Sequence, residues 1–479
     1  MYMKHRSPLL LLLTFLLLLL TSELLLAQPN RHHLARVRRS HANKHSRHTH
    51  HRKGGGRGHR KNHHKATVAP TPGMSVNSNL FAQYGSKLTG TGFTGEVIDE
   101  ASALAFSGDG LTALVGGKGD AEGAGAVWVF TRSSTGSNVW SQLDNKLLGR
   151  GNTGKAAQGT SVALDGQGLT AAVGGPTDNG GLGAVWIFVR SAGSSSWSQL
   201  GQKLVGDGYI MGDTNSYIYQ GSSVALSDDG LTLVVGGSSD NNGIGAVWVF
   251  TFSNNVWTQQ GPKLVGTGYV GEPAQGTSVS ISADGNLIAL GGPDDTTGAT
   301  GAVWVFVRVN GLWYQKGKKL VGTGHVGTSF QGCSVSLSAD ATTMVVGARG
   351  DNLGLGAAWI FVRNTLTGDW TQQGEKLTGN GYVNKVGLVY QGYSVHISGD
   401  GNTFVMGGID DENGIGASWV FTRNSPTTWA QLGSKLVGTN YQGSYIGQGT
   451  AVVITRDSNT VFVGGPLDNL IGAVWVFVR

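Results

Sequence analysis

The pattern of apolar and polar positions divides most of this chain into short strands separated by glycine-rich turns. It is clearest from residue 220 to residue 264, where apolar side chains alternate with polar ones and stop at a glycine or an Asp-Gly pair. Alternation with a period of two is typical of β-strands, and Asp-Gly favours a tight hairpin. The four predicted strands of this unit cover residues 220–227, 231–235, 245–250 and 257–264.

The third predicted strand recurs through the chain. Its motif, Gly-Ala-Val-Trp-Val-Phe or a close variant, occurs seven times at intervals of roughly 60 residues. A strand that is apolar on both faces fits a sheet stacked between two other sheets. The repeat therefore predicts an all-β fold, a seven-bladed β-propeller of four-stranded antiparallel blades. The seven tryptophans of the motif are Trp128, Trp186, Trp248, Trp304, Trp359, Trp419 and Trp475.

The two ends of the repeat region predict how the ring closes. The segment Phe81–Leu88 has the pattern of a fourth strand but precedes every first strand, whereas the last unit stops after its third strand at Arg479. We therefore expect the N-terminal strand to complete the blade that contains Trp475, which leaves no free sheet edge. The propeller is assigned to residues 79–479.

The first 27 residues predict a targeting segment. A basic start precedes an almost pure leucine run from Leu9 to Leu20, and Ala27 is a small residue suited to a cleavage site. We expect a cleaved signal peptide, a secreted protein and no transmembrane span after cleavage. The alternative is an uncleaved N-terminal anchor at the cell surface, although Glu23 interrupts the apolar run.

Residues 28–78 are expected to form a basic, histidine-rich, disordered arm. Between residues 31 and 65 the chain has 12 Lys or Arg residues, ten of its 13 histidines and no acid. Such a segment cannot bury enough surface to fold. Its charge suits an acidic polysaccharide or another anionic surface, and no specific nucleic acid. The dibasic run that ends at Arg39 is also a candidate cleavage site. The predicted anion-binding residues are Arg36, Arg38, Arg39, Arg47, Arg52, Lys53, Arg57, Arg60, Lys61 and Lys65.

The order of motifs within the repeat resembles a known family. Gln-Gly-X-Ser-Val, Val-Gly-Gly-Pro, an aspartate, Gly-Ala-Val-Trp-Val-Phe and Trp-X-Gln-X-Gly-X-Lys-Leu follow one another. This order resembles FG-GAP-type repeats, which build the seven-bladed propeller of integrin α-subunit heads. Gln158-Gly159 stands where that family has Phe-Gly, and Gly174-Gly175-Pro176 stands where it has Gly-Ala-Pro. Paired glycines followed by a distant tryptophan are also similar to kelch repeats, which we keep as a second family interpretation.

The resemblance implies extracellular recognition or cell adhesion. We expect a secreted or cell-surface propeller that binds an extracellular protein or glycan, with the basic arm tethering it to anionic surfaces. The resemblance does not imply that the chain is an integrin α-subunit. It also implies calcium in some loops, where the family has an Asp-X-Asp-X-Asp-Gly pattern. Here the loops have too few alternating carboxylates for a full cage, so most of these aspartates are interpreted as turn residues. The candidates for calcium are Asp294, Asp295, Asp410 and Asp411.

Three links between a fourth strand and the next first strand are unusually rich in aromatic residues. In an antiparallel blade these links emerge on the same face as the aspartate loops, and loops on a rigid scaffold often carry recognition. Exposed tyrosines there would form a binding patch; the alternative is that they fold back to plug the mouth of the propeller. The candidate ligand-binding residues are Tyr209, Tyr217, Tyr219, Tyr382, Tyr390, Tyr441 and Tyr445.

Catalysis is not expected. A propeller enzyme needs a site that differs from its six equivalents, and the body has only His325 and His396, in different units, with acids that mostly repeat in register. No organic cofactor is indicated. The alternatives to a recognition module are a structural matrix or coat component without a discrete ligand and, less favoured, a propeller enzyme. The tripeptide Arg349-Gly350-Asp351, which integrins bind, is interpreted as a chance match because Asp351 is the aspartate of its repeat.

Overall fold

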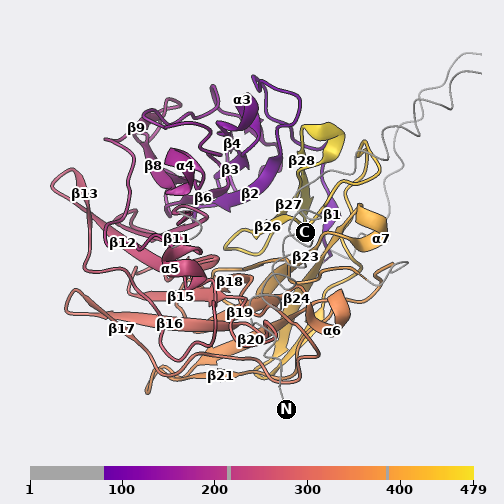
Figure 1. The fold of residues 1–479 in the computed structure, drawn as a ribbon. Helices are drawn as coiled ribbons and strands as arrows, with labels where there is room; N and C mark the ends of the chain where they lie inside the picture. The colour runs from indigo at the N-terminus through magenta and orange to yellow at the C-terminus, as the bar shows by residue number, and fades with distance from the viewer. Residues whose placement is uncertain (1–79, 213–216, 384–387) are drawn as a thin grey trace, which may run out of the picture. The chain divides into compact units, whose positions relative to one another are not determined.

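The computed structural model describes residues 80–212, 217–383 and 388–479, all within the compact unit Ser75–Arg479. These residues form seven four-stranded antiparallel sheets, which follow one another around a ring (Figure 1). The inner strands of neighbouring blades contact each other in order, and the last contacts the first. The expected seven-bladed β-propeller is therefore confirmed.

Each blade runs from an inner strand to an outer strand. The inner strands are β2 (Glu100–Phe106), β6 (Ser161–Leu164), β10 (Ser223–Leu226), β14 (Ser278–Ile281), β18 (Ser334–Leu337), β22 (Ser394–Ile397) and β26 (Ala451–Ile454). The second strands are β3 (Thr112–Gly117), β7 (Thr170–Gly175), β11 (Thr232–Gly237), β15 (Leu287–Gly292), β19 (Thr343–Ala348), β23 (Thr403–Gly408) and β27 (Thr460–Gly465). The third strands are β4 (Ala126–Thr131), β8 (Ala184–Val189), β12 (Ala246–Ser253), β16 (Ala302–Val309), β20 (Ala357–Arg363), β24 (Ala417–Ser425) and β28 (Ala473–Val478). The outer strands are β5 (Ser141–Gln142), β9 (Ser198–Gln199), β13 (Val256–Gln259), β17 (Leu312–Gln315), β21 (Trp370–Gln372), β25 (Thr428–Gln431) and β1 (Ala82–Gln83).

The seven third-strand tryptophans form the cores between blades. All seven are fully buried, and each Nε1 donates a hydrogen bond to a backbone carbonyl in the link that leads into its blade; Trp304 bonds to Thr267 at 2.9 Å. The ring lies so close to this link that only glycine fits beside it: a Cβ added at Gly266 would lie 2.2 Å from Trp304 Cδ1. The tryptophan ring therefore requires a glycine at this position in every link. The tryptophans therefore have a packing role between the blades.

On the opposite face, arginines at the ends of third strands connect adjacent blades. Arg423 stacks on Trp429 of its own blade, 4.6 Å from the ring centroid, and donates to the hydroxyl of Thr343 in the preceding blade at 2.9 Å. Arg190 bonds to Thr112 in the same way at 2.7 Å. Burial lowers the pKa of both guanidinium groups, but arginine remains charged in proteins. These hydrogen bonds between neighbouring blades supplement the apolar contacts.

The N-terminal strand closes the ring, as the sequence predicts. β1 pairs with β28 (Ala82 opposite Val478), so the indigo strand lies beside the yellow blade in Figure 1. Leu88 then exchanges two backbone hydrogen bonds with Val474, at 2.8 and 2.9 Å. The amide of Glu100 donates to Ile471 at 2.8 Å, which joins the first blade to the last. The blade containing Trp475 is thus completed from both ends of the described chain.

Removing this strand should destabilise the whole ring. A chain that starts at residue 93 should lose more than about 4 kcal/mol of unfolding free energy, because Phe81 and Leu88 both pack on core clusters and each such loss typically costs 2–5 kcal/mol. The measurement is urea unfolding of this chain beside one that starts at residue 76. Equal midpoints would contradict the closure.

Candidate functional site

Seven aspartates, one per blade, organise the face on which the links emerge. All are buried. In each blade one carboxylate oxygen accepts a backbone N–H of the incoming link, and the other pairs with a lysine that follows the outer strand. In the second blade, for example, Asp178 accepts from Thr153 at 2.7 Å and pairs with Lys203 at 2.5 Å. The pairs are Asp120–Lys146, Asp178–Lys203, Asp240–Lys263, Asp295–Lys319, Asp351–Lys376, Asp411–Lys435 and Asp468–Lys87.

Six of these aspartates begin a tight single turn. Two successive residues in it have left-handed backbone angles, as at Asn241 (φ 52°) and Asn242 (φ 58°). Asparagine and glycine tolerate this conformation best, which explains the Asp-Asn-Asn-Gly loop. The turns are α3 (Asp120–Gly123), α4 (Asp178–Gly181), α5 (Asp240–Gly243), α6 (Asp351–Gly354), α7 (Asp411–Gly414) and η1 (Asp468–Leu470).

The four candidate calcium ligands lie in two blades that are not neighbours. Asp295 accepts from Val270 at 2.8 Å and pairs with Lys319, and Asp411 accepts from Val383 at 2.6 Å and pairs with Lys435. Both carboxylates therefore already have cationic partners. In the described part of the chain no three His, Cys, Asp or Glu side chains are grouped to hold a metal. Calcium at these positions stays a prediction.

A second contact is repeated in every blade, and in one blade an ionisable residue replaces a neutral one. In six blades a buried glutamine holds the glycine of the incoming link by two hydrogen bonds; Gln158 accepts from Gly149 at 2.6 Å and donates back at 2.9 Å. In the first blade Glu100 takes this place. Its Oε1 accepts from Gly90 at 2.6 Å, and its buried Oε2 has no partner. Burial, opposed by this hydrogen bond, raises the pKa of Glu100 to about 8.

The seven candidate tyrosines are not brought into one site. They fall into two groups, one in the link before β10 and one in the two links before β22 and β26. In the first group the rings of Tyr217 and Tyr219 stack, with centroids 5.2 Å apart. Tyr209 is half-buried and packs against the core of its blade, so it is less available for binding. Four of the seven remain well exposed: Tyr217 (43%), Tyr382 (38%), Tyr441 (39%) and Tyr445 (43%).

Two of the tyrosines, Tyr217 and Tyr445, also pack against the aspartate loops of the preceding blades. A Cβ added at Gly414 would lie 2.1 Å from the ring of Tyr445, and one at Gly181 would lie 2.3 Å from Tyr217. One side of each ring is therefore held against the preceding blade while the other side faces solvent. Burial, together with the charge and hydrogen bond of Asp410, raises the pKa of Tyr445 well above its ordinary value.

An arginine and two further aromatic residues, which sequence reasoning missed, lie near the second group. The guanidinium of Arg349 lies over the rings of Phe330 and Tyr393, 5.1 and 5.8 Å from their centroids. Aligning the repeats could have identified Tyr393, because it stands where other blades have a small residue such as Thr277. Within the Arg-Gly-Asp tripeptide, Arg349 is thus stacked on aromatic rings and Asp351 is buried.

The inner strands enclose a central channel that is narrow at the end away from the links. Residues from all seven inner strands or their hairpins line a cavity of about 130 Å³ there. Arg456 and Asp228, from two different blades, form an ion pair at this end. His396 lines the same cavity and its Nδ1 accepts the amide of Ile454 at 3.3 Å. Burial lowers the pKa of His396 to about 4, so it is neutral at physiological pH.

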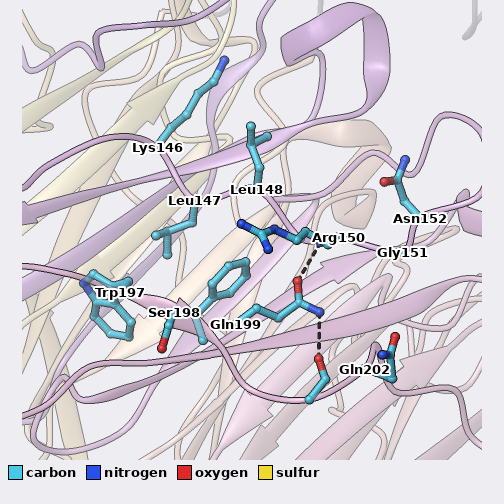
Figure 2. Close-up of a pocket in the computed structure, with 13 residues that line it drawn as sticks. Lys146, Leu147, Leu148, Arg150, Gly151, Asn152, Trp197, Ser198, Gln199 and Gln202 are labelled. Atoms are coloured by element: carbon cyan, nitrogen blue, oxygen red, sulfur yellow. Dashed lines mark hydrogen bonds between the residues drawn. The ribbon is translucent and has the colours of Figure 1, made fainter.

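A large groove lies on the outer side of the first two blades. Figure 2 shows it between the link that leaves the first blade, residues 146–152, and the outer strand β9 of the second. Its volume is about 810 Å³. Arg150 is central among the residues that line it (Figure 2). Neither its size nor its lining follows from the repeat pattern alone.

The predicted signal peptide and the predicted anion-binding arm, including every arginine and lysine assigned to it, lie outside the described residues. Within the described ranges, 80–212, 217–383 and 388–479, no helix has the length and apolar character needed to cross a membrane.

Comparisons with known proteins support the fold alone. No protein-family model and no curated protein matches this chain. A candidate 6-phosphogluconolactonase from Bacteroides uniformis is similar in structure, with a TM-score of 0.51 and 14% identity over 72% of this chain and 88% of that one. The hydrazine synthase of Kuenenia stuttgartiensis gives a TM-score of 0.51 and 13% identity over 82% of this chain and 99% of that one. At such identities neither activity transfers to this chain.

Glu100 should make stability fall as pH rises. The folded protein binds the Glu100 proton more tightly than the unfolded chain, whose pKa is near 4.5. The stabilisation is therefore complete below pH 4.5 and is lost as the pH rises towards 8. Replacing Glu100→Gln should raise the unfolding free energy by several kcal/mol at pH 8 and little at pH 5. The matched variant Gln158→Glu should introduce the same slope, and parallel profiles for all three proteins would contradict this account.

Chelation should leave the stability of the propeller unchanged. Because lysines already neutralise Asp295 and Asp411, calcium would have to displace them. We expect the same melting temperature in EDTA and in millimolar calcium. A higher melting temperature in calcium, lost in the double variant Asp294→Asn and Asp410→Asn, would instead establish the calcium sites that the family resemblance implies.

Proposed function

We propose that this protein is a secreted or cell-surface recognition propeller of the FG-GAP type, which binds an extracellular protein or glycan through the face where its links emerge. The observation that carries the proposal is the group of partly exposed tyrosines on this face. Two of them, Tyr217 and Tyr445, are held on one side against an aspartate loop, so their rings are ordered before a partner arrives. Ordered aromatic side chains give contact area at low entropic cost.

The composition of these links supports the same proposal. The link before β10 contains Tyr, Ser, Asn, Gly and Asp between residues 207 and 219, with Ile210 and Met211 both nearly half exposed. Tyr, Ser, Gly and Asn dominate the loops with which antibodies bind their targets. An exposed apolar patch on a rigid body favours a macromolecular partner over a small substrate.

The regular use of carboxylates argues against an enzyme. A propeller enzyme would need acids or histidines that are free to react. The seven repeated aspartates are neutralised by lysines and buried, and His396 is buried and bonded to a backbone amide. The proposal also includes the basic arm, whose charge would tether the propeller to anionic surfaces.

The proposal is tested by removing the exposed rings. The triple variant Tyr217→Ser, Tyr382→Ser and Tyr441→Ser should bind cells or extracellular matrix at least tenfold more weakly, since aromatic anchors dominate interface energies. Tyr314→Ser is the matched control, because Tyr314 is 52% exposed on the outer strand β17. Binding is measured by surface plasmon resonance on matrix components at 0.15 and 0.5 M salt. Equal affinity of the triple variant and the control would exclude the tyrosine face.

A further inference from the structure

The groove on the outer side of the first two blades has a mixed apolar and polar lining. Leu147 and Phe188 are buried at its base, and Leu148 is 47% exposed. Trp197 lines it as well, with Arg190 stacked on the indole 5.1 Å from its centroid. A volume near 810 Å³ falls in the range of small-molecule sites, which are typically 300–1,000 Å³. The groove thus has the dimensions and apolar floor of a ligand site.

Its polar groups are partly without partners. Both ends of the Gln199 amide have partners: the oxygen accepts from the amide of Arg150 at 2.6 Å, and the nitrogen donates to Gly201 at 3.0 Å. Asn152 donates to Gly154 at 2.9 Å, which leaves its carbonyl oxygen available. Among the described residues, neither the guanidinium of Arg150 nor the amide of Gln202 has a hydrogen-bond or ion-pair partner.

Arg150 is not required by the fold. Its backbone carbonyl accepts the indole N–H of Trp186 at 2.8 Å, a role that the equivalent residue fills in every blade. The side chain at this position is therefore free to vary. Only the link that leaves the first blade has a positively charged residue there. The six equivalents are Thr91, Asp207, Thr267, Thr323, Asn380 and Thr439.

The tryptophan beside the groove has a buried indole N–H without a hydrogen-bond partner. The indole N–H groups of Trp313 and Trp429 are bonded to Gln260 and Gln373 of the preceding blade, both at 2.8 Å. Leu143 occupies the corresponding position for Trp197, whose Nε1 is therefore buried without a partner, as are those of Trp140, Trp257 and Trp370. Arg150 is therefore the residue at this groove that differs in charge from its six equivalents.

We propose that this groove binds an acidic saccharide unit. A carboxylate or sulfate pairs with the guanidinium of Arg150, which is suited to two parallel hydrogen bonds. The amides of Asn152 and Gln202 bond to hydroxyl groups, and the apolar face of the sugar ring packs on Leu148 and Trp197. The site does not include the candidate tyrosines and does not depend on the proposed function. It places an anion site on the propeller body, which has a net charge of −7 from residue 66 onward.

The test is calorimetric titration of the full chain with short, soluble probes. The probes are a glucuronate-containing disaccharide, a sulfated disaccharide and a neutral disaccharide, each at 0.15 and 0.5 M NaCl. The full chain should bind at least one acidic probe and not the neutral one. Arg150→Thr, which introduces the residue found at four of the six equivalent positions, should weaken that binding at least tenfold with an unchanged melting temperature.

The matched control is Lys318→Thr, which removes the same charge from an exposed site away from the groove. It should bind like the unaltered protein. Equal loss in both variants would overturn the proposal by assigning the binding to net charge. Unchanged binding by Arg150→Thr, equal binding of the neutral probe, or no binding of either acidic probe would also overturn it. The tyrosine variants should bind the acidic probe normally, so failure of the tyrosine face is distinguishable from failure of this site.

Discussion

The antiparallel pairing of β1 with β28 is the constraint on which the other features depend. A propeller blade buries its tryptophan only when a sheet lies on each side, and a ring provides this for all seven blades only when it is closed. The closing strand brings Leu88 to Val474 and Glu100 to Ile471, so the first and last blades are joined through backbone hydrogen bonds. Once the ring is closed, each link is held over a tryptophan, and the face that carries the links becomes rigid.

On that face, repeated polar contacts and variable side chains have separate roles. The aspartate and the glutamine hold backbone groups of the links, and the lysine neutralises the aspartate, so these buried acids already have partners. Other side chains on this face vary between blades. They include the tyrosines before β10, β22 and β26, and Arg150 at the groove. The proposed functions therefore rest on departures from the repeat.

The repeat pattern predicted the fold well because its information is local and redundant. Seven copies of one strand pattern specify the blade, and the unmatched segment at Phe81 specifies the closure. The partners of the aspartates were harder to predict, since Lys319 and Asp295 meet only after the blade folds. Arg349 was considered only as part of a chance Arg-Gly-Asp match, and Tyr393 was missed because a single unit does not show that it replaces a small residue; comparing equivalent positions identifies it. The groove beside Arg150 depends on the packing of two blades, which no single repeat encodes.

Hydrogen exchange measured by mass spectrometry tests the closed ring most directly. The amides of Tyr84 and Leu88 donate to Val476 and Val474 in the last blade. If closure makes the ring one cooperative unit, peptides spanning residues 80–92 should retain slow amides that exchange only with global unfolding, at the rate of the slowest amides in β28. Exchange of these amides within seconds, while β28 stays protected, would show that the ring is stable without its closing strand and would contradict the account.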